Sequence, residues 1–305
     1  KVLDISSNLF SSIPDEITSL SNLRGLFIDL KSKNEYVATL PANFDQLKQL
    51  THLSLEAPQH FDWDNALTQI GAIKNLVSLK LDVKNTPLSP NVGALIHVKY
   101  LSLQKWSFKS YDKKEAGLLP KELGLLSNLQ ALEIYWNKLK EIPEEVENLK
   151  SLVRLSCHLG KDKTFEFDKN FFRIARIPNL KVLNIKDGQL GALHSNNYVE
   201  SSIESLILSN NKISSLSRNF IRFPKLKKLD LSRNEFEQFP VGISTSENLK
   251  IVDISDNPLY ELPISLIHAD GLIQLDIRDT KVSKKVISHL KMFKETRPFK
   301  LYYYE

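Results

Sequence analysis

The sequence predicts an α/β solenoid, a curved horseshoe of short repeats stacked side by side around one continuous core. The stretch Leu226–Asn248 contains a spaced set of leucines followed by an asparagine, and the same pattern recurs 23 residues earlier, from Ile203, and 23 residues later, from Leu249. A fixed period of this length is typical of repeat architectures, because a single repeat of that size cannot bury its own core. We expect about twelve repeats along the 305 residues.

Each repeat begins with a predicted strand, because its first residues follow the pattern L-x-x-L-x-L, as in residues 226–231. Alternation of this kind turns the leucines inward and the intervening side chains outward. We expect the strands to stack in parallel at about 4.8 Å, giving a concave sheet. The asparagine that follows, Asn234 in this repeat, can bond neighbouring backbone groups as a ladder.

The second half of a regular repeat contains a proline near its start, such as Pro240 in the segment 239–243. Since proline cannot continue a regular helix, we expect an irregular or 3₁₀ convex side. The repeats that begin at Leu23, Leu50, Val98 and Leu152 depart from this pattern and carry long irregular segments. Long loops on a rigid scaffold often carry function.

The repeat pattern changes after Val282. Apolar residues then recur at helical spacing, at Val286, Leu290 and Phe293. Ser283 is a suitable N-cap and Pro298 ends the helix before a short strand. We expect residues 283–305 to form a C-terminal cap, in the same domain as the array of residues 1–282, because the last repeat would otherwise expose an apolar face and a strand edge.

These repeats resemble the leucine-rich repeat family, in the 23-residue type with the pattern LPxxIxxLxxL that many bacterial proteins and Ras-group-related plant proteins contain. The resemblance covers essentially the whole chain. It implies a non-enzymatic scaffold that recognises a partner protein on the concave sheet.

Composition argues against several other classes of protein. Net charge is +5, from 41 basic and 36 acidic residues, and no long basic run indicates a nucleic-acid partner. No apolar run approaches the roughly 18 residues that a membrane span requires. The single cysteine, Cys157, cannot form an intramolecular disulfide and stands at a leucine position, so we expect it in the core. We expect a monomer.

No catalytic or cofactor motif is present. The seven histidines show no metal-ligand spacing, and the chain has no phosphate loop and no nucleophile elbow. An open sheet also does not exclude water as a hydrolase site normally does. We therefore expect no enzymatic activity, no metal and no cofactor.

The outward strand positions of repeats 3 to 7 combine aromatic, basic and acidic side chains. Tyr, Trp and Arg are the residue types that most often anchor protein interfaces. This predicted binding patch consists of His52, Glu56, Asp82, Tyr100, Gln104, Trp106, Glu133, Tyr135, Trp136, Arg154 and His158. The alternative is that some members, above all the two tryptophans, fill gaps left by missing consensus residues.

Three carboxylates are also stacked at the 23-residue spacing, at Asp230, Asp253 and Asp276. Such a column could hold a cation or an amine. Basic residues that could neutralise it lie close by in the sequence, at Lys228, Arg233, Lys250 and Arg278. The pattern favours an ordinary solvated face, so we expect substitution of Asp253 to change partner binding little.

Three functions remain open. The first is a bacterial protein-binding scaffold, exported or displayed on the cell surface. The second is the recognition part of a larger receptor or effector, because the chain begins inside a repeat and we expect it to be a fragment or a processed product. The third is a carbohydrate or small-ligand binder that uses Tyr100, Trp106, Tyr135 and Trp136.

Overall fold

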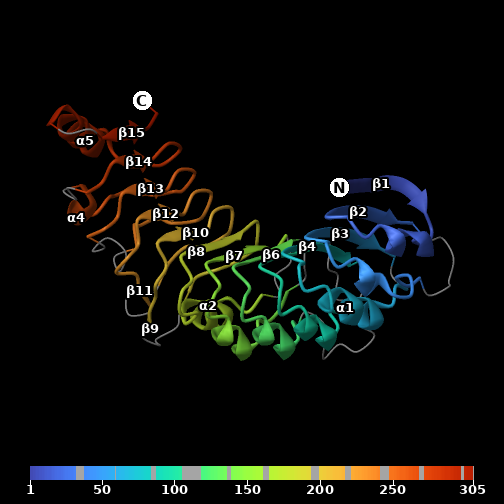
Figure 1. Cartoon of the computed structure of the whole chain (residues 1–305). Helices are drawn as coiled ribbons and strands as arrows, with labels where there is room; N and C mark the ends of the chain where they lie inside the picture. The colour runs from blue at the N-terminus through green and yellow to red at the C-terminus, as the bar shows by residue number, and fades with distance from the viewer. Residues whose placement is uncertain are drawn as a thin grey trace. The chain divides into compact units, whose positions relative to one another are not determined.

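The computed structural model describes most of the chain as two compact units, Lys1–Val153 and Arg154–Glu305. The described residues are 1–31, 38–58, 60–83, 87–104, 118–135, 139–160, 165–193, 199–216, 221–240, 247–267, 271–296 and 299–304. Figure 1 shows the elements of both units.

The N-terminal unit contains a parallel sheet in which each strand pairs with the strand of the next repeat. Its strands are β1 (Val2–Phe10), β2 (Gly25–Leu30), β3 (His52–Ala57), β4 (Ser78–Val83), β5 (Tyr100–Gln104) and β6 (Ala131–Tyr135). Equivalent residues lie side by side, so that Gly25, His52, Ser78, Tyr100 and Ala131 form one row.

The C-terminal unit repeats this arrangement with shorter strands. They are β7 (Arg154–His158), β8 (Val182–Lys186), β10 (Ser205–Ile207), β12 (Lys228–Asp230), β13 (Ile251–Asp253), β14 (Gln274–Asp276) and β15 (Lys300–Tyr302). A second, two-stranded sheet joins β9 (Val199–Glu200) to β11 (Ile221–Arg222). The parallel sheets, with one strand for each repeat, confirm the predicted solenoid fold.

The return segments of the N-terminal unit are mostly 3₁₀ helices, as predicted. They are η1 (Asp15–Ser19), η2 (Phe44–Gln46), η3 (Pro90–Ala94), η4 (Lys121–Leu125) and η5 (Glu144–Asn148). Proline stands immediately before η1, η4 and η5 and opens η3. A proline at this position sets the backbone for a short turn and forbids a preceding helix.

Three described return segments form α-helices instead, where the irregular or 3₁₀ conformation was expected. Two of them, α1 (Trp63–Gly71) and α2 (Phe167–Ala175), belong to repeats without the consensus proline. The third, α4 (Ile264–Ile267), is a single turn directly after Pro263. In α1 the Asp62 carboxylate accepts the Asn65 N–H at 3.0 Å as an N-cap. Spaced apolar residues, such as Ala66 and Ile70, are buried on one side, so that amphipathic spacing is sufficient for a helix once proline is absent.

Asparagine side chains connect consecutive repeats in the C-terminal unit. Asn234 Nδ2 lies 2.9 Å from the Leu208 carbonyl of the previous repeat and 3.0 Å from that of Leu231 in its own. Its Oδ1 accepts the N–H of Ile213 at 3.0 Å. Asn211 and Asn257 make equivalent contacts, and all three side chains are buried. This confirms the predicted asparagine ladder.

The C-terminal segment forms the predicted helix and strand. Helix α5 (Lys284–Thr296) follows Ser283, whose Oγ accepts the Val286 N–H at 3.4 Å. Leu290 is 1% exposed, and β15 pairs with β14. The domain boundary at residue 282 stays a prediction.

Within the described ranges, no helix combines the length and the apolar character that a bilayer span requires.

We expect Asn234→Ala to lower the free energy of unfolding by about 3 kcal/mol, because it removes several hydrogen bonds and leaves the buried Ile213 N–H without its acceptor. Urea denaturation measures the loss, and hydrogen exchange should place it in the repeats on either side of β12. Asn248→Ala is the matched control, since this exposed side chain makes a single bond, to the Pro224 carbonyl at 2.8 Å. Equal losses in the two variants would contradict a structural role of the ladder.

Candidate functional site

The side of each sheet that faces away from the core, here called the open face, presents the first, third and fifth residues of a strand. In β6, Leu132 and Ile134 are buried, whereas Ala131, Glu133 and Tyr135 are half-buried. The same alternation of burial holds along β3 and β5, since successive side chains point to opposite sides of a sheet. The open face is therefore where the predicted patch must lie.

The most accessible members of the predicted patch stand in the first row of the N-terminal unit. Tyr100 is 48% exposed, and its hydroxyl lies 3.4 Å from the Gln130 side chain. His52, which is exposed, stands in the same row, and its Nδ1 lies 2.9 Å from the Thr51 hydroxyl. Both rings are presented on strands and can contact a partner without prior rearrangement.

Glu133 and Tyr135 lie together on β6. The Tyr135 hydroxyl donates to Glu133 Oε2 at 3.2 Å. Burial, followed by the charge and hydrogen bond of Glu133, raises the pKa of Tyr135. The phenol is therefore held as a neutral hydrogen-bonding group beside a carboxylate.

The fifth row, which contains Glu56, Asp82 and Gln104, is less accessible. Asp82 is only 5% exposed, although strand alternation predicts an outward side chain. Glu56 and Gln104 are half-buried. The fifth row therefore exposes less side-chain surface to a partner than His52 and Tyr100 of the first row do.

The remaining patch members divide into two groups. Arg154, exposed, and His158, half-buried, belong to β7 of the C-terminal unit, and His158 Nδ1 lies 3.4 Å from Asp187 Oδ2. Trp106 and Trp136 lie outside the described residues. Two members of the predicted patch in the same row, Tyr100 and His52, thus provide its accessible part in the N-terminal unit.

Cys157 lies in the core of the C-terminal unit, as predicted. It is fully buried, and burial raises the pKa of its thiol to about 12. A thiol held in this state does not act as a nucleophile near neutral pH.

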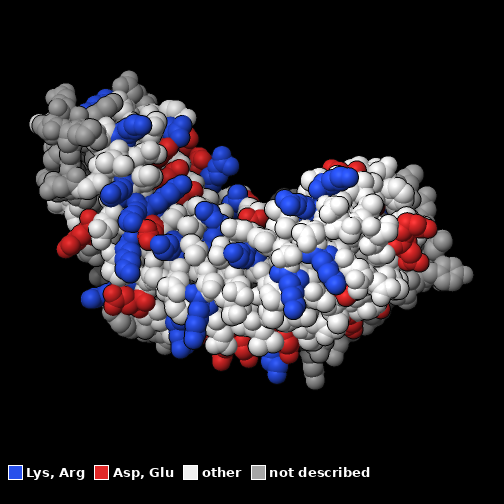
Figure 2. All heavy atoms as spheres, in the orientation of Figure 1, with Lys and Arg blue, Asp and Glu red and all other residues white. Residues whose placement is uncertain are grey.

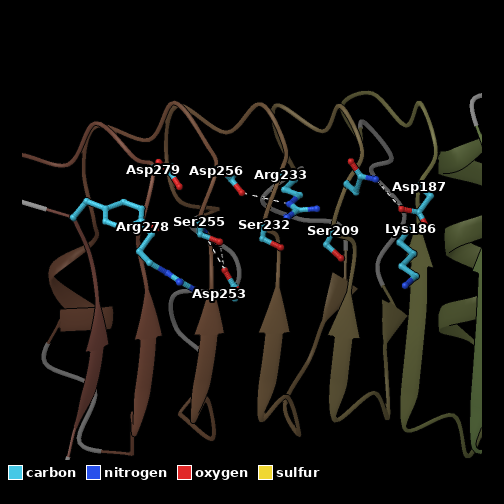
Figure 3. A pocket seen from close by; sticks show the side chains of 12 residues that line it. Lys186, Asp187, Ser209, Ser232, Arg233, Asp253, Ser255, Asp256, Arg278 and Asp279 are labelled. Atoms are coloured by element: carbon cyan, nitrogen blue, oxygen red, sulfur yellow. Dashed lines mark hydrogen bonds and ion pairs between the residues drawn. The ribbon is translucent and has the colours of Figure 1, made fainter.

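The open face of the C-terminal unit is hollowed over the ends of β8 to β14, with a volume of about 430 Å³ (Figure 3). Basic and acidic side chains are interspersed over these repeats (Figure 2). Its floor includes one residue from each repeat, in register two residues beyond the aspartate column. This floor row consists of Lys186, Ser209, Ser232, Ser255, Arg278 and Tyr304.

A second row borders the hollow at the turns that follow the strands. Its members, Asp187, Asn210, Arg233, Asp256 and Asp279, all adopt left-handed backbone conformations, with φ between 53° and 61°. Asn and Asp tolerate this region better than most residues. The turns hold these side chains at the rim, and the 23-residue period places them next to one another.

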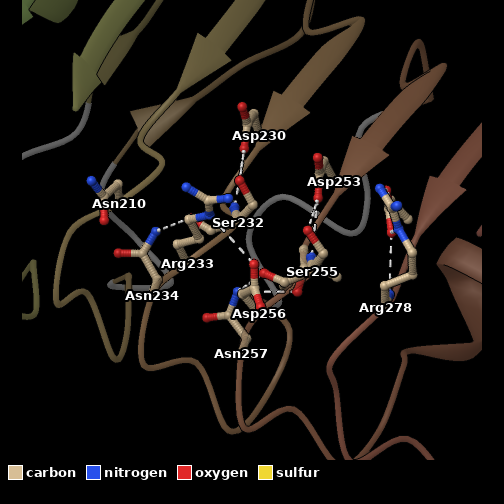
Figure 4. Close-up of polar contacts among 12 residues, drawn as sticks. Asn210, Asp230, Ser232, Arg233, Asn234, Asp253, Ser255, Asp256, Asn257 and Arg278 are labelled. Atoms are coloured by element: carbon tan, nitrogen blue, oxygen red, sulfur yellow. Dashed lines mark hydrogen bonds and ion pairs between the residues drawn. The ribbon is translucent and has the colours of Figure 1, made fainter. Parts of the chain in front are cut away.

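The aspartate column is held by the neighbouring floor row. Ser232 Oγ donates to Asp230 Oδ1 at 2.7 Å, and Figure 4 shows the same contact from Ser255 to Asp253. In the last repeat an arginine replaces the serine, and Arg278 forms a bidentate pair with Asp276. The Asp-x-Ser spacing was present in the sequence and would have indicated these bonds.

The arginines do not neutralise the column evenly. Arg278 pairs with Asp276, whereas Arg233 Nε lies 3.4 Å from Asp256 Oδ2 at the rim. Among the described residues, no three His, Cys, Asp or Glu side chains are grouped as metal ligands.

Asp253 lies in an environment that disfavours the ionised form of its carboxyl group. Burial raises the pKa of its carboxyl, Asp230 and Asp276 on the adjacent strands raise it further, and only the bonds from Ser255 oppose the change. The folded chain therefore binds this proton more tightly than the unfolded chain, and the ionised carboxylate opposes folding at neutral pH. The penalty disappears as the pH falls through the folded pKa towards the unfolded value.

We expect Asp253→Asn to raise the melting temperature at pH 7, because the amide can still accept the bond from Ser255 and carries no charge. The gain should shrink as the pH is lowered towards 3.8, the usual value for an aspartate. Thermal denaturation between neutral and acid pH measures both effects. Glu247→Gln, at an exposed position outside the strands, is the control and should show no comparable gain. A destabilised Asp253→Asn variant at pH 7 would contradict the assignment.

A family model and a curated relative each match part of this chain. A family model described as Leucine rich repeat matches residues 178–236. A probable disease resistance protein of Arabidopsis thaliana is 29% identical over 187 residues, which cover 61% of this chain and 19% of that protein. The chain thus spans about a fifth of the length of this curated relative.

Two solved structures show the same fold. One is the ectodomain of the Arabidopsis thaliana receptor kinase GASSHO1/SCHENGEN3, in complex with CASPARIAN STRIP INTEGRITY FACTOR 2, with a TM-score of 0.60, 22% identity and coverage of 99% of this chain and 38% of that one. The other is an internalin of Listeria monocytogenes, with a TM-score of 0.54, 16% identity and coverage of 100% and 82%. Plant and bacterial proteins both occur here, so a bacterial origin stays a prediction. The repeat match, the parallel sheets with one strand for each repeat and the shared fold identify the chain as a leucine-rich repeat protein.

Proposed function

We propose that this chain is a non-enzymatic scaffold that binds a partner protein on the open face, and that the patch in repeats 3 to 7 anchors the partner. The observation that carries the proposal is the exposure of His52 and Tyr100 in the first row of the N-terminal unit. Tyr100, 48% exposed, stands there on a strand whose leucines are fully engaged in the core.

The chemistry of the patch fits protein recognition. A tyrosine ring buries a large area and has few torsions to immobilise, and its hydroxyl adds a directional bond. Tyr135 and Glu133 provide such a hydroxyl next to a carboxylate. In the C-terminal unit Arg154 is exposed, and its side chain makes no hydrogen bond or ion pair with another described residue, so its guanidinium is available to a partner.

The comparisons support binding rather than catalysis. The receptor-kinase ectodomain was solved with a partner bound, which is consistent with recognition as the use of this fold. The buried, protonated thiol of Cys157 does not offer a nucleophile on either face. We therefore propose that the open face acts by binding alone.

We expect the double variant Tyr135→Ala with Arg154→Ala to weaken partner binding by at least about tenfold, with little change in melting temperature. Both side chains are outward, and interface anchors of these types commonly contribute more than about 1.4 kcal/mol each. The wild-type chain, used as bait, identifies a partner by mass spectrometry, and calorimetry with the purified partner then measures the dissociation constant.

Tyr260→Ala is the matched aromatic control, because Tyr260 is 48% exposed but lies outside the strands, where its hydroxyl accepts a bond from Lys281 at 2.9 Å. This control should bind as wild type does. Full binding by the double variant would remove the patch from the proposal.

A further inference from the structure

Most charges around the hollow of the C-terminal unit are already matched. Arg278 is bound to Asp276, and Arg233 lies against Asp256. Asp187 accepts a bond from Asn210 at 2.7 Å. The last two contacts join side chains of adjacent repeats, whereas Arg278 and Asp276 belong to the same repeat. All three leave little attraction for a ligand at these side chains.

Several charged side chains on the open face have no ion pair with the other residues that the structure describes. At the hollow they include Lys186 and Asp253, with Asp279 at the rim. The Lys186 side chain also forms no hydrogen bond within the described part of the chain. The carboxylates of Asp230 and Asp253 accept bonds from their own serines and have no cation within salt-bridge distance in the described part of the chain. A positive group, Lys186, therefore lines the hollow at β8, and a negative group, Asp253, lines it at β13 (Figure 3). Asp230 lies beside Asp253 on the adjacent strand β12.

The strand order sets the separation of these charges. Lys186 lies on β8, and the neighbouring strands are β10, β12 and β13 in turn. Two or three strand spacings correspond to about 10–14 Å across the sheet. An extended chain advances about 3.3 Å per residue, so this distance corresponds to three or four residues of a segment that crosses the strands.

Hydroxyl groups lie between the charges. Ser209 and Ser232 occupy the floor row on the two intermediate repeats. The Ser232 hydroxyl donates a hydrogen bond to Asp230, and the Ser232 oxygen can still accept a hydrogen bond from a backbone N–H. A peptide that crosses the hollow could therefore find partners for its main chain as well as for its charged ends.

The charge pattern argues against other ligands. A polyanion such as a nucleic acid would place phosphates beside two carboxylates that no cation neutralises. A purely basic segment would meet Lys186 and the exposed Arg233. The raised pKa of Asp253 also indicates that an ionised group is kept here at some expense of stability, which a bound cation would relieve.

We propose that this hollow binds an extended segment of a partner protein that has one acidic and one basic side chain three to four residues apart. The acidic side chain pairs with Lys186, and the basic side chain lies between Asp230 and Asp253. This site is separate from the patch of the N-terminal unit and does not depend on it. The sequence alone favoured a solvated face for the aspartate column. We propose a binding site instead, because unpaired charges of opposite sign lie apart on the same open face.

The test uses acetylated and amidated peptides in which one Glu and one Arg are separated by zero to six Gly or Ser residues. Titration into the ¹⁵N-labelled full chain, followed by NMR, measures each dissociation constant and locates the shifted amides. We expect the tightest binding with two or three intervening residues, and shifts confined to β8, β10, β12 and β13.

Variants identify the charges. Lys186→Gln and Asp253→Asn should each weaken the best peptide about fivefold, the size expected of a solvent-accessible ion pair. They should also remove the dependence on spacing. Glu247→Gln and Tyr100→Ala should bind as wild type does, and melting temperatures verify that every variant is folded. The Tyr100 variant separates this site from the proposed patch.

Three results would overturn the proposal. One is an affinity that does not change with the separation of Glu and Arg. Another is equal affinity for a peptide with two Arg residues, which would reveal a simple acidic surface. Absence of any shift at millimolar peptide would also refute it.

Discussion

The asparagine ladder is the constraint on which the rest of the C-terminal unit depends. Each side chain, such as Asn234, binds carbonyls of two repeats and accepts an N–H from the previous one. Because every bond involves backbone, the ladder sets the offset between neighbours whatever the outward residues are. The parallel register of β10, β12, β13 and β14 follows from this offset, and equivalent positions become contiguous rows.

Because the outward residues form rows on the surface, they can be substituted without loss of the fold. The core positions and the ladder supply stability, while the positions between them carry charges and rings. Asp253 is an example of an outward residue that lowers stability, since its ionised form opposes folding although a partner can reach it. Tyr100 shows the same separation of roles, because its neighbours Leu101 and Leu103 form the core and its ring does not.

Local sequence was sufficient where one residue type decides the backbone. Proline before η4 and η5 indicated 3₁₀ turns, and Ser283 indicated the start of α5. The 3₁₀ expectation failed for α1 and α2, because it rested on the consensus proline that both repeats lack, and their amphipathic spacing forms an α-helix instead. Local sequence also did not predict solvent accessibility, because Asp82 is buried at a position where alternation alone predicts exposure.

The sequence by itself determined the period, the parallel strands, the direction in which each side chain points and the ladder, since all of these repeat every 23 residues and depend on local pattern. Tertiary structure decided which charges neutralise each other. Arg233 could have paired with Asp230 or Asp253, and its place at a left-handed turn directs it to Asp256 instead. Pairing and desolvation depend on atoms from adjacent repeats, at separations that differ by only a few ångströms, and a linear pattern does not contain those distances.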